Sequence, residues 1–113
     1  MLSNSMEKVV RMKKRKISQI SVNIPVMFFE ENHKVIAFTP VLDLSTTGKN
    51  MEDAAKNFEE ALAIFIEECD SHGTLEDCLR SYGWVTGQSQ DSGLVPPRMI
   101  GNKNLAIQMP AFA

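Results

Sequence analysis

Few side chains in this chain of 113 residues are of a type and spacing that could do chemistry. It has two histidines and two cysteines. Cys69 and His72 are close enough in sequence to form a nucleophile–base pair, but Cys69 falls on an apolar stripe, where a small buried hydrophobe is the simpler interpretation. Cys78 follows nine residues later, and the Cys69–His72–Cys78 spacing matches no zinc pattern. We therefore expect no metal site and no cysteine nucleophile.

The other candidates for catalysis are equally sparse. His33 lies in an expected turn, and Asp43 follows an expected strand without a partner at a known spacing. Gly48 and Lys49 lack the remaining residues of a phosphate-binding loop. Acidic residues on the polar face of the main expected helix are best explained as solvated: Glu59, Glu60, Glu67 and Glu68. The sequence predicts no catalytic residue, no cofactor and no enzymatic activity.

The stretch of residues 48–73 predicts the helix around which the chain is organised. Its apolar residues recur in steps of three and four, which gives an amphipathic helix one buried face. About 20 residues in this helix would span about 30 Å. Asn50 is the expected N-cap, with Asp53 replacing the glutamate of a capping box, and Gly73 is the expected C-terminal stop. The stripe comprises Met51, Ala54, Ala55, Phe58, Ala61, Leu62, Phe65, Ile66 and Cys69.

Three strands are expected before this helix. Residues 17–30 alternate between apolar and polar positions, and Pro25 places the first strand at an edge or at a bulge. Residues 30–34 form a polar turn into a second strand at residues 35–39, which predicts an antiparallel hairpin. Residues 41–47 are expected as a brief third strand. The alternating apolar positions of the first strand are Ile20, Val22, Ile24, Val26 and Phe28.

The region after Gly73 has weaker patterns. Thr74 is the expected N-cap of a short second helix that ends at Gly83, and Trp84 is expected to pack in the core or cap it. Residues 86–104 have loop composition, and residues 105–109 either return as a strand or pair with another chain. The fold class is α+β, with β-β-β-α-β order in a small single domain: an antiparallel sheet, one main helix and a short second helix. The expected divisions are an N-terminal arm at 1–16, the α+β domain at 17–85, and a loop with a possible strand at 86–113.

Charge is distributed unevenly along the chain. Residues 1–16 hold six bases and one acid, a net charge of +5, whereas the remainder holds six bases and thirteen acids, a net charge of −7. The acidic remainder argues against broad nucleic-acid contact, because phosphate binding needs clustered cations. The basic arm either contacts nucleic-acid phosphates or is a solvated terminus. The candidate contact residues are Arg11, Lys13, Lys14, Arg15 and Lys16.

Composition is ordinary for a soluble globular protein, with 43% hydrophobic and 23% charged residues. No apolar run is long enough for a membrane span, and no apolar segment follows the basic arm as it would in a secretory signal. Two cysteines do not make a disulfide framework. We therefore expect a reduced, cytoplasmic protein that does not contact membranes.

Two motifs resemble those of the HicB-like antitoxin family. Residues 37–42 (AFTPVL) are similar to its A-x-x-P-x-L strand end, and residues 48–54 (GKNMEDA) are similar to its G-x-T-x-x-E-A helix start. The resemblance covers roughly residues 20–71. Asn50 stands where threonine is usual and Asp53 where glutamate is usual, and both preserve the capping chemistry. Ser45 stands where cysteine is frequent.

The resemblance implies a partial ribonuclease H-like fold without catalytic carboxylates. It also implies a function: binding and neutralising a small RNA-cleaving HicA-type toxin, with self-association into a homo-oligomer. Members often add a C-terminal DNA-binding domain, which residues 74–113 do not resemble. Two other functions stay open at this point. One is a self-associating α+β scaffold or regulator without a toxin, and the other is a nucleic-acid-binding regulator that uses the basic arm.

Overall fold

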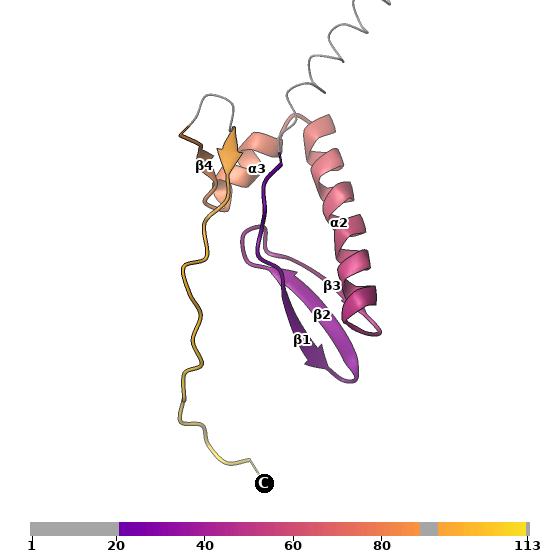
Figure 1. Ribbon diagram of the computed structural model, residues 1–113, viewed down its shortest axis with the longest axis vertical. Coiled ribbons are helices and arrows are strands. Elements are labelled where there is room, and N and C mark those ends of the chain that lie inside the picture. The colour runs from indigo at the N-terminus through magenta and orange to yellow at the C-terminus, as the bar shows by residue number, and fades with distance from the viewer. Residues whose placement is uncertain (1–20, 89–92, 113) are drawn as a thin grey trace, which may run out of the picture.

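The structure is a computed structural model that describes residues 21–88 and 93–112 (Figure 1). Its centre is a three-stranded antiparallel sheet in the order β1-β2-β3, formed by β1 (Met27–Glu31), β2 (Lys34–Thr39) and β3 (Leu44–Gly48). The helix α2 (Met51–Ser71) packs against β2 and β3 (Figure 1). This arrangement confirms the predicted α+β class and its β-β-β-α order.

The β1–β2 hairpin has a two-residue turn. Asn32 and His33 have φ angles of 52° and 65°, and positive φ at both central positions is what a type I′ turn requires. The register pairs Phe28 with Ala37 and Phe29 with Ile36. Because β1 begins two residues after Pro25 and lies at the edge of the sheet, the ladder needs no amide hydrogen from that proline.

The caps of α2 follow the expectation closely. The Asn50 side chain accepts a hydrogen bond from Asp53 N at 2.8 Å, while the Asp53 carboxylate accepts from Lys49 N at 2.9 Å. Two backbone amides at the first turn are thus satisfied by side chains. At the other end Gly73 has a φ of 72°, the left-handed conformation of a C-terminal stop.

Two small hydrophobic clusters hold the sheet, the helix and the C-terminal elements together. In the first, Ala37 of β2 packs with Ala54 and Phe58 of α2. Partly buried residues pack against these three: Ile24, Val26, Phe28, Val35, Leu44 and Leu62. In the second, Val41, Leu42 and Trp84 pack beneath the second half of α2. Val41 and Leu42 are in the turn between β2 and β3, so the third strand starts at Leu44, later than predicted.

The short second helix α3 (Leu75–Ser81) is present where predicted, but Thr74 does not cap it with its side chain. Its hydroxyl donates instead to Cys69 O at 3.3 Å, because the turn from α2 brings that carbonyl within reach. After Trp84, β4 (Val85–Thr86) pairs antiparallel with β5 (Leu94–Val95). This two-residue ladder lies in the region that composition indicated as loop.

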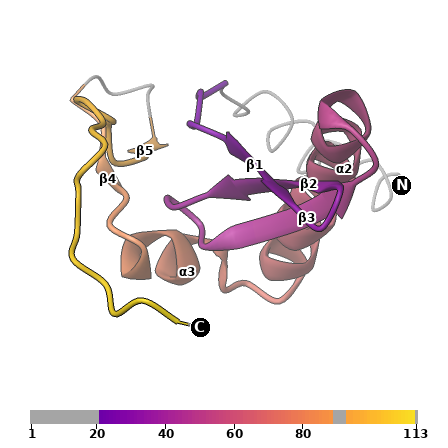
Figure 2. The same ribbon diagram turned by 90° about the horizontal axis from the view of Figure 1, so that it is seen from below.

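Residues 98–112, named here the tail, leave β5 in an extended path without helix or strand. In both views the tail runs on the side of the sheet away from α2 and stands apart from it (Figures 1 and 2). All of its residues are exposed, including Ile100 at 90% and Leu105 at 74%. The possible C-terminal strand at residues 105–109 is therefore not formed within the chain itself.

Candidate functional site

An apolar groove of about 740 Å³ is the candidate site. It lies between the second half of α2, α3, the β4–β5 ladder and the segment that leads into β1. Most of its lining is apolar, with Ile66 of α2 and Leu79 of α3 on facing elements. The full lining is Ser21, Val22, Ile24, Leu42, Leu62, Ile66, Asp70, Leu75, Glu76, Leu79, Arg80, Trp84, Thr86, Gly93 and Leu94.

Trp84 fixes the floor of the groove. Its indole nitrogen donates to Val41 O at 2.9 Å, and only 7% of the residue is exposed. A buried indole with its N–H paired is stable in a core, so the prediction that Trp84 packs rather than forms an open platform is confirmed. The same contact ties the segment that follows α3 to the β2–β3 turn.

Charge around the groove is predominantly negative. Asp70 and Glu76 lie in its lining, where Arg80 is the single base and donates from Nε to Glu76 Oε2 at 3.0 Å. The helix α2 as a whole holds seven acids and Lys56 as its only base, a net charge of −6. The groove is thus an apolar surface beside a strongly acidic helix.

The acids of α2 extend to its C-terminal end, where the helix dipole is already negative. Glu67, Glu68 and Asp70 lie near this end, and the last turn contains no basic residue. Cations, not acids, stabilise a helix C-terminus, each by about 0.3–1 kcal/mol. The acids at this end therefore destabilise α2, and they place negative charge next to the groove.

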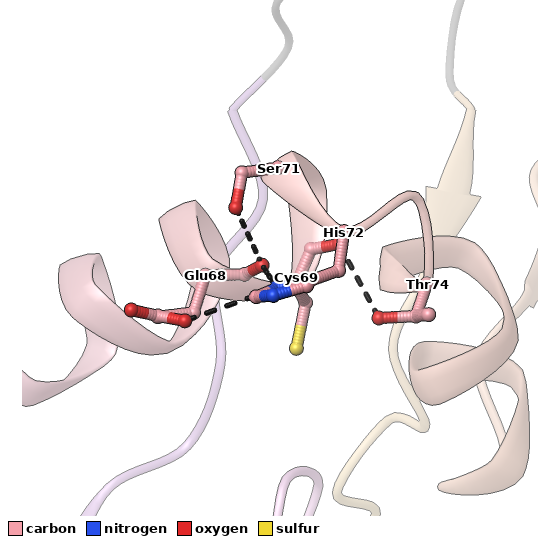
Figure 3. A network of polar contacts seen from close by, with 5 residues as sticks. All are labelled: Glu68, Cys69, Ser71, His72 and Thr74. Atoms are coloured by element: carbon pink, nitrogen blue, oxygen red, sulfur yellow. Dashed lines mark hydrogen bonds and ion pairs between the residues drawn. The ribbon is translucent and has the colours of Figure 1, made fainter.

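Polar side chains at this end are used to close the α2–α3 junction (Figure 3). His72 Nδ1 lies 2.7 Å from Glu68 O and 3.8 Å from Glu68 Oε1. The Ser71 hydroxyl donates to the same carbonyl, and Thr74 donates to Cys69 O. Since these contacts satisfy the last carbonyls of the helix, the network has a structural explanation and needs no ligand.

Cys69 and Cys78 meet at this junction as free thiols, each half-buried. Burial raises the pKa of the Cys78 thiol above its ordinary value, and the neighbouring Cys69 raises the pKa further by its charge and by a hydrogen bond. A raised pKa keeps the thiol protonated near neutral pH, whereas a nucleophilic cysteine needs its thiolate. This chemistry does not favour Cys78 as a nucleophile, and Cys69, expected as a small packing group, is half-buried beside it.

A second unusual surface is the sheet face that points away from α2. Because the register places Phe28, Ala37 and Thr46 side by side toward the helix, the alternate positions must point the other way. We name these alternate positions the open face. Of them, Phe29 is 54% exposed, and none belongs to either hydrophobic cluster. The open face comprises Met27, Phe29, Glu31, Lys34, Ile36, Phe38, Ser45 and Thr47.

Sequence reasoning missed both surfaces. The signal for the open face was present, since β1 and β2 carry apolar residues at both parities: Phe28 and Phe29, Ile36 and Ala37. Runs apolar on both faces indicate a strand covered on both sides. No local signal marked the groove, because its walls come from separate segments between Ser21 and Leu94 that only the complete fold brings together.

The candidate nucleic-acid contacts Arg11, Lys13, Lys14, Arg15 and Lys16 lie outside the described residues. Within residues 21–88 and 93–112, no group of three or more His, Cys, Asp or Glu side chains is placed to hold a metal ion. In that same part of the chain, no helix combines the length and apolarity that crossing a membrane requires.

Comparisons of the chain with protein-family models, with curated proteins and with solved structures find no match. The resemblance to the HicB-like antitoxin family therefore stays a prediction from the motifs at residues 37–42 and 48–54.

Proposed function

We propose that the chain is a non-catalytic, antitoxin-like protein that binds and masks a small basic RNA-cleaving partner of the HicA type. The observation that carries the proposal is the apolar groove beside a helix of net charge −6. The motif resemblance supplies the class of partner, and the cytoplasmic location belongs to the same proposal.

The two properties of this surface suit different stages of binding. Acidic residues along about 30 Å of helix attract a basic protein over a distance, which raises the association rate. The apolar groove then holds side chains of the partner out of water, which slows dissociation. A small-molecule site would not need the extended charge, so the pair of features favours a basic protein as the occupant.

Masking requires no catalytic group on this chain. A bound protein that covers the catalytic surface of a nuclease excludes RNA by volume alone. The acidic helix also resembles the charge of the excluded RNA, so a surface that is basic enough to bind RNA is complementary to α2.

The test begins with the full-length tagged chain recovered from its own cells and mass spectrometry of what co-purifies. A small basic protein near one-to-one is expected, and its purified form should cleave RNA alone and lose this activity when the chain is added. The proposal is overturned if the chain co-purifies with no such protein, or if the recovered protein's ribonuclease activity is unaffected by the chain.

A matched pair of variants locates the contact. Ile66 lines the groove and is 42% exposed, whereas Ile64 lies on the same helix, outside the groove lining, and is 61% exposed. Ile66→Ser should weaken the complex about tenfold or more, and Ile64→Ser should not. Equal effects of the two substitutions would show that the groove is not the binding surface.

Self-association is the second candidate, and the open face of the sheet favours it. Single antiparallel sheets commonly have one solvated face, but that face is then polar. Here four apolar residues form one part of it, with Phe29 exposed and Met27, Ile36 and Phe38 half-buried. Burial in a homo-oligomer would complete their cover. A scaffold or regulator without a toxin partner would need this association and not the groove.

Nucleic-acid binding through the basic arm is the remaining alternative from the sequence. The structure of residues 21–88 and 93–112 has no bearing on it. Its test is the affinity of the chain for RNA and DNA before and after replacement of Arg11, Lys13, Lys14, Arg15 and Lys16 by glutamine. An unchanged affinity would dispose of this alternative.

A further inference from the structure

The tail has the composition of a segment that is buried in an assembly. Its sequence places Leu105, Ile107 and Met109 at alternate positions, which lie on one side of an extended chain. Their exposed fractions are 74%, 72% and 64%, and Phe112 near the end is 82% exposed. Contiguous apolar side chains that are exposed to water commonly mark an interaction site, so this row indicates that another surface covers it.

The start of the tail directs it away from its own body. Pro96 is half-buried next to β5, and the pair Pro96–Pro97 fixes an extended backbone at this point. The residues that follow are exposed throughout, and both views show the tail separated from the sheet (Figures 1 and 2). The open face of the same chain is thus left uncovered by the chain's own tail.

One chain therefore carries two apolar surfaces that do not meet within it: the tail and the open face. Both lie on the side of the molecule away from α2, and neither contributes to the groove. We infer that the tail of one copy covers the open face of a second copy, and that the exchange is reciprocal. This inference deepens the self-association proposed above and rests on it, and it does not depend on the nuclease partner.

Length and size fit this exchange. Fifteen extended residues reach about 50 Å, whereas strands of five or six residues are about 17–20 Å long. The tail can therefore cross from its own body and still span a neighbouring sheet. Each copy offers fifteen tail residues and eight residues of the open face, which together fall within the roughly 20–30 residues a side of a standard interface.

A second copy is also the occupant that symmetry favours. In a two-fold dimer each copy donates one tail and accepts one, so both unpartnered surfaces are used with no residue left over. A different protein on the open face would leave the tail exposed, and a different protein on the tail would leave the open face exposed.

The first test is the molar mass of the full-length wild-type chain in solution, measured by light scattering across a concentration series without any partner. We expect a dimer. The variant Leu105→Ser/Ile107→Ser/Met109→Ser should dissociate, with the dissociation constant raised about tenfold for each buried side chain. A matched control, Ala106→Ser/Gln108→Ser on the other side of the same tail segment, should remain dimeric.

The second test asks whether the contact is made between copies. The sheet variant Phe29→Asp keeps its tail but places an unpaired charge in the contact, and the tail variant keeps its open face. Each homodimer then loses both tail–sheet contacts, so each variant alone should be monomeric at concentrations where the wild type is a dimer. Mixed together they should form a heterodimer, because one tail–sheet contact remains intact. Emission of the single buried Trp84 confirms that each variant is folded.

A monomeric wild type, a dimer indifferent to the tail variant, or a mixture that stays monomeric would each overturn the inference. Failure of the partner proposal would be seen in a different measurement, the binding of the nuclease. The Ile66→Ser variant should still dimerise, and loss of the nuclease complex in that variant has no effect on the mass of the chain alone.

Discussion

At the scale of single residues, Trp84 joins the segment after α3 to the turn between β2 and β3. Its indole reaches back across 43 positions to the carbonyl of Val41, which is itself 5% exposed. That carbonyl loses this donor if the indole is removed. Leaving the buried Val41 carbonyl without a partner therefore costs more free energy than the net amount that the hydrogen bond contributes when it forms.

We predict that Trp84→Phe keeps an aromatic ring in the core but destabilises the chain by about 1–3 kcal/mol, because the Val41 carbonyl is left buried without a donor. Urea unfolding followed by far-ultraviolet circular dichroism measures this change. The control is Tyr82→Phe, at a residue that is 38% exposed, and its effect should stay within about 0.5 kcal/mol. Equal stabilities of the two variants would contradict the role given to the indole N–H.

Cys78 gives a prediction about pH. Because burial first and Cys69 second raise the pKa of its thiol, Cys78 should react with iodoacetamide more slowly than an ordinary cysteine near pH 7.5. The substitution Cys69→Ser removes one of the two causes, so the midpoint of the pH–rate profile of Cys78 should move to lower pH. Mass spectrometry of the alkylated peptide follows the rate, and a profile that stays in place or moves upward would contradict the argument.

The sequence predicted correctly those residues whose conformation depends on their immediate neighbours in the chain. Asn50 and Gly73 were predicted correctly, because a cap is determined by its immediate neighbours. Val41 and Leu42 were wrongly expected in a strand, since β-branched and aliphatic residues also suit a buried turn. There Asp43 takes a φ of 50°, and Trp84 closes the turn from a distant part of the chain.

At the scale of elements, the β3–α2 junction leaves no room for a side chain. A Cβ added at Gly48 would meet Ala54 N, and it would lie 2.6 Å from Ala54 Cα and 2.7 Å from the carbonyl carbon of Asp53. These are backbone atoms of the first turn of α2, so the helix would have to move. The same junction is tied by the Asn57 side chain, which donates to Thr47 O at 2.8 Å.

We therefore expect Gly48→Ala to destabilise the chain by about 1–3 kcal/mol or more, through overpacking against backbone that cannot rotate away. Gly101→Ala is the control, since nothing lies within 4 Å of a Cβ at that position. Thermal unfolding of the two variants, measured side by side, gives the comparison. A Gly48→Ala protein as stable as Gly101→Ala would mean that the approach of β3 to α2 is looser than described.

The acidic end of α2 gives a prediction in which stability and binding change in opposite directions. Glu67→Lys should stabilise the free chain by about 0.3–1 kcal/mol, because it places a cation near the helix C-terminus. It should also slow association with a basic partner, because it reduces the negative charge that steers the encounter. Unfolding measurements and stopped-flow association rates test the two effects.

Lys56→Glu on the same helix is the counterpart. It makes α2 more acidic, so the association rate with the partner should rise, and both rate effects should shrink as salt is added. The electrostatic part of the proposed function would be wrong if the wild type, Glu67→Lys and Lys56→Glu associate at the same rate. It would also be wrong if the rates do not change with salt concentration.

At the scale of the whole molecule, the sequence predicted the α+β class and its order, but not the surfaces through which the chain would act. The period of 3.6 in α2 reports which side of the helix is buried, and the apolar runs of β1 and β2 indicate only that both sides of these strands are covered. Neither pattern reports what lies on the side that is not buried in the chain's own core. The groove, the open face and the tail all depend on segments brought together, or left apart, by the complete fold.

Exchange of tails also predicts a property of the molecule as a whole. If folding and association are coupled, the wild-type Tm should rise with protein concentration, because the dimer is favoured by mass action. The Leu105→Ser/Ile107→Ser/Met109→Ser variant should have a Tm that does not vary with concentration. Scanning calorimetry over a hundredfold range of concentration makes the measurement, and a constant wild-type Tm would count against a coupled dimer.

The contact between Trp84 and Val41 has a consequence for the order in which the chain is built. β1, β2, β3 and α2 are consecutive neighbours, so their contacts close short loops and form early. The groove depends on a contact that closes a loop of 43 residues, which must wait until Trp84 has been synthesised. A nascent chain therefore has its sheet and acidic helix before it has its groove, so a basic partner of the kind proposed would be attracted before it could be held.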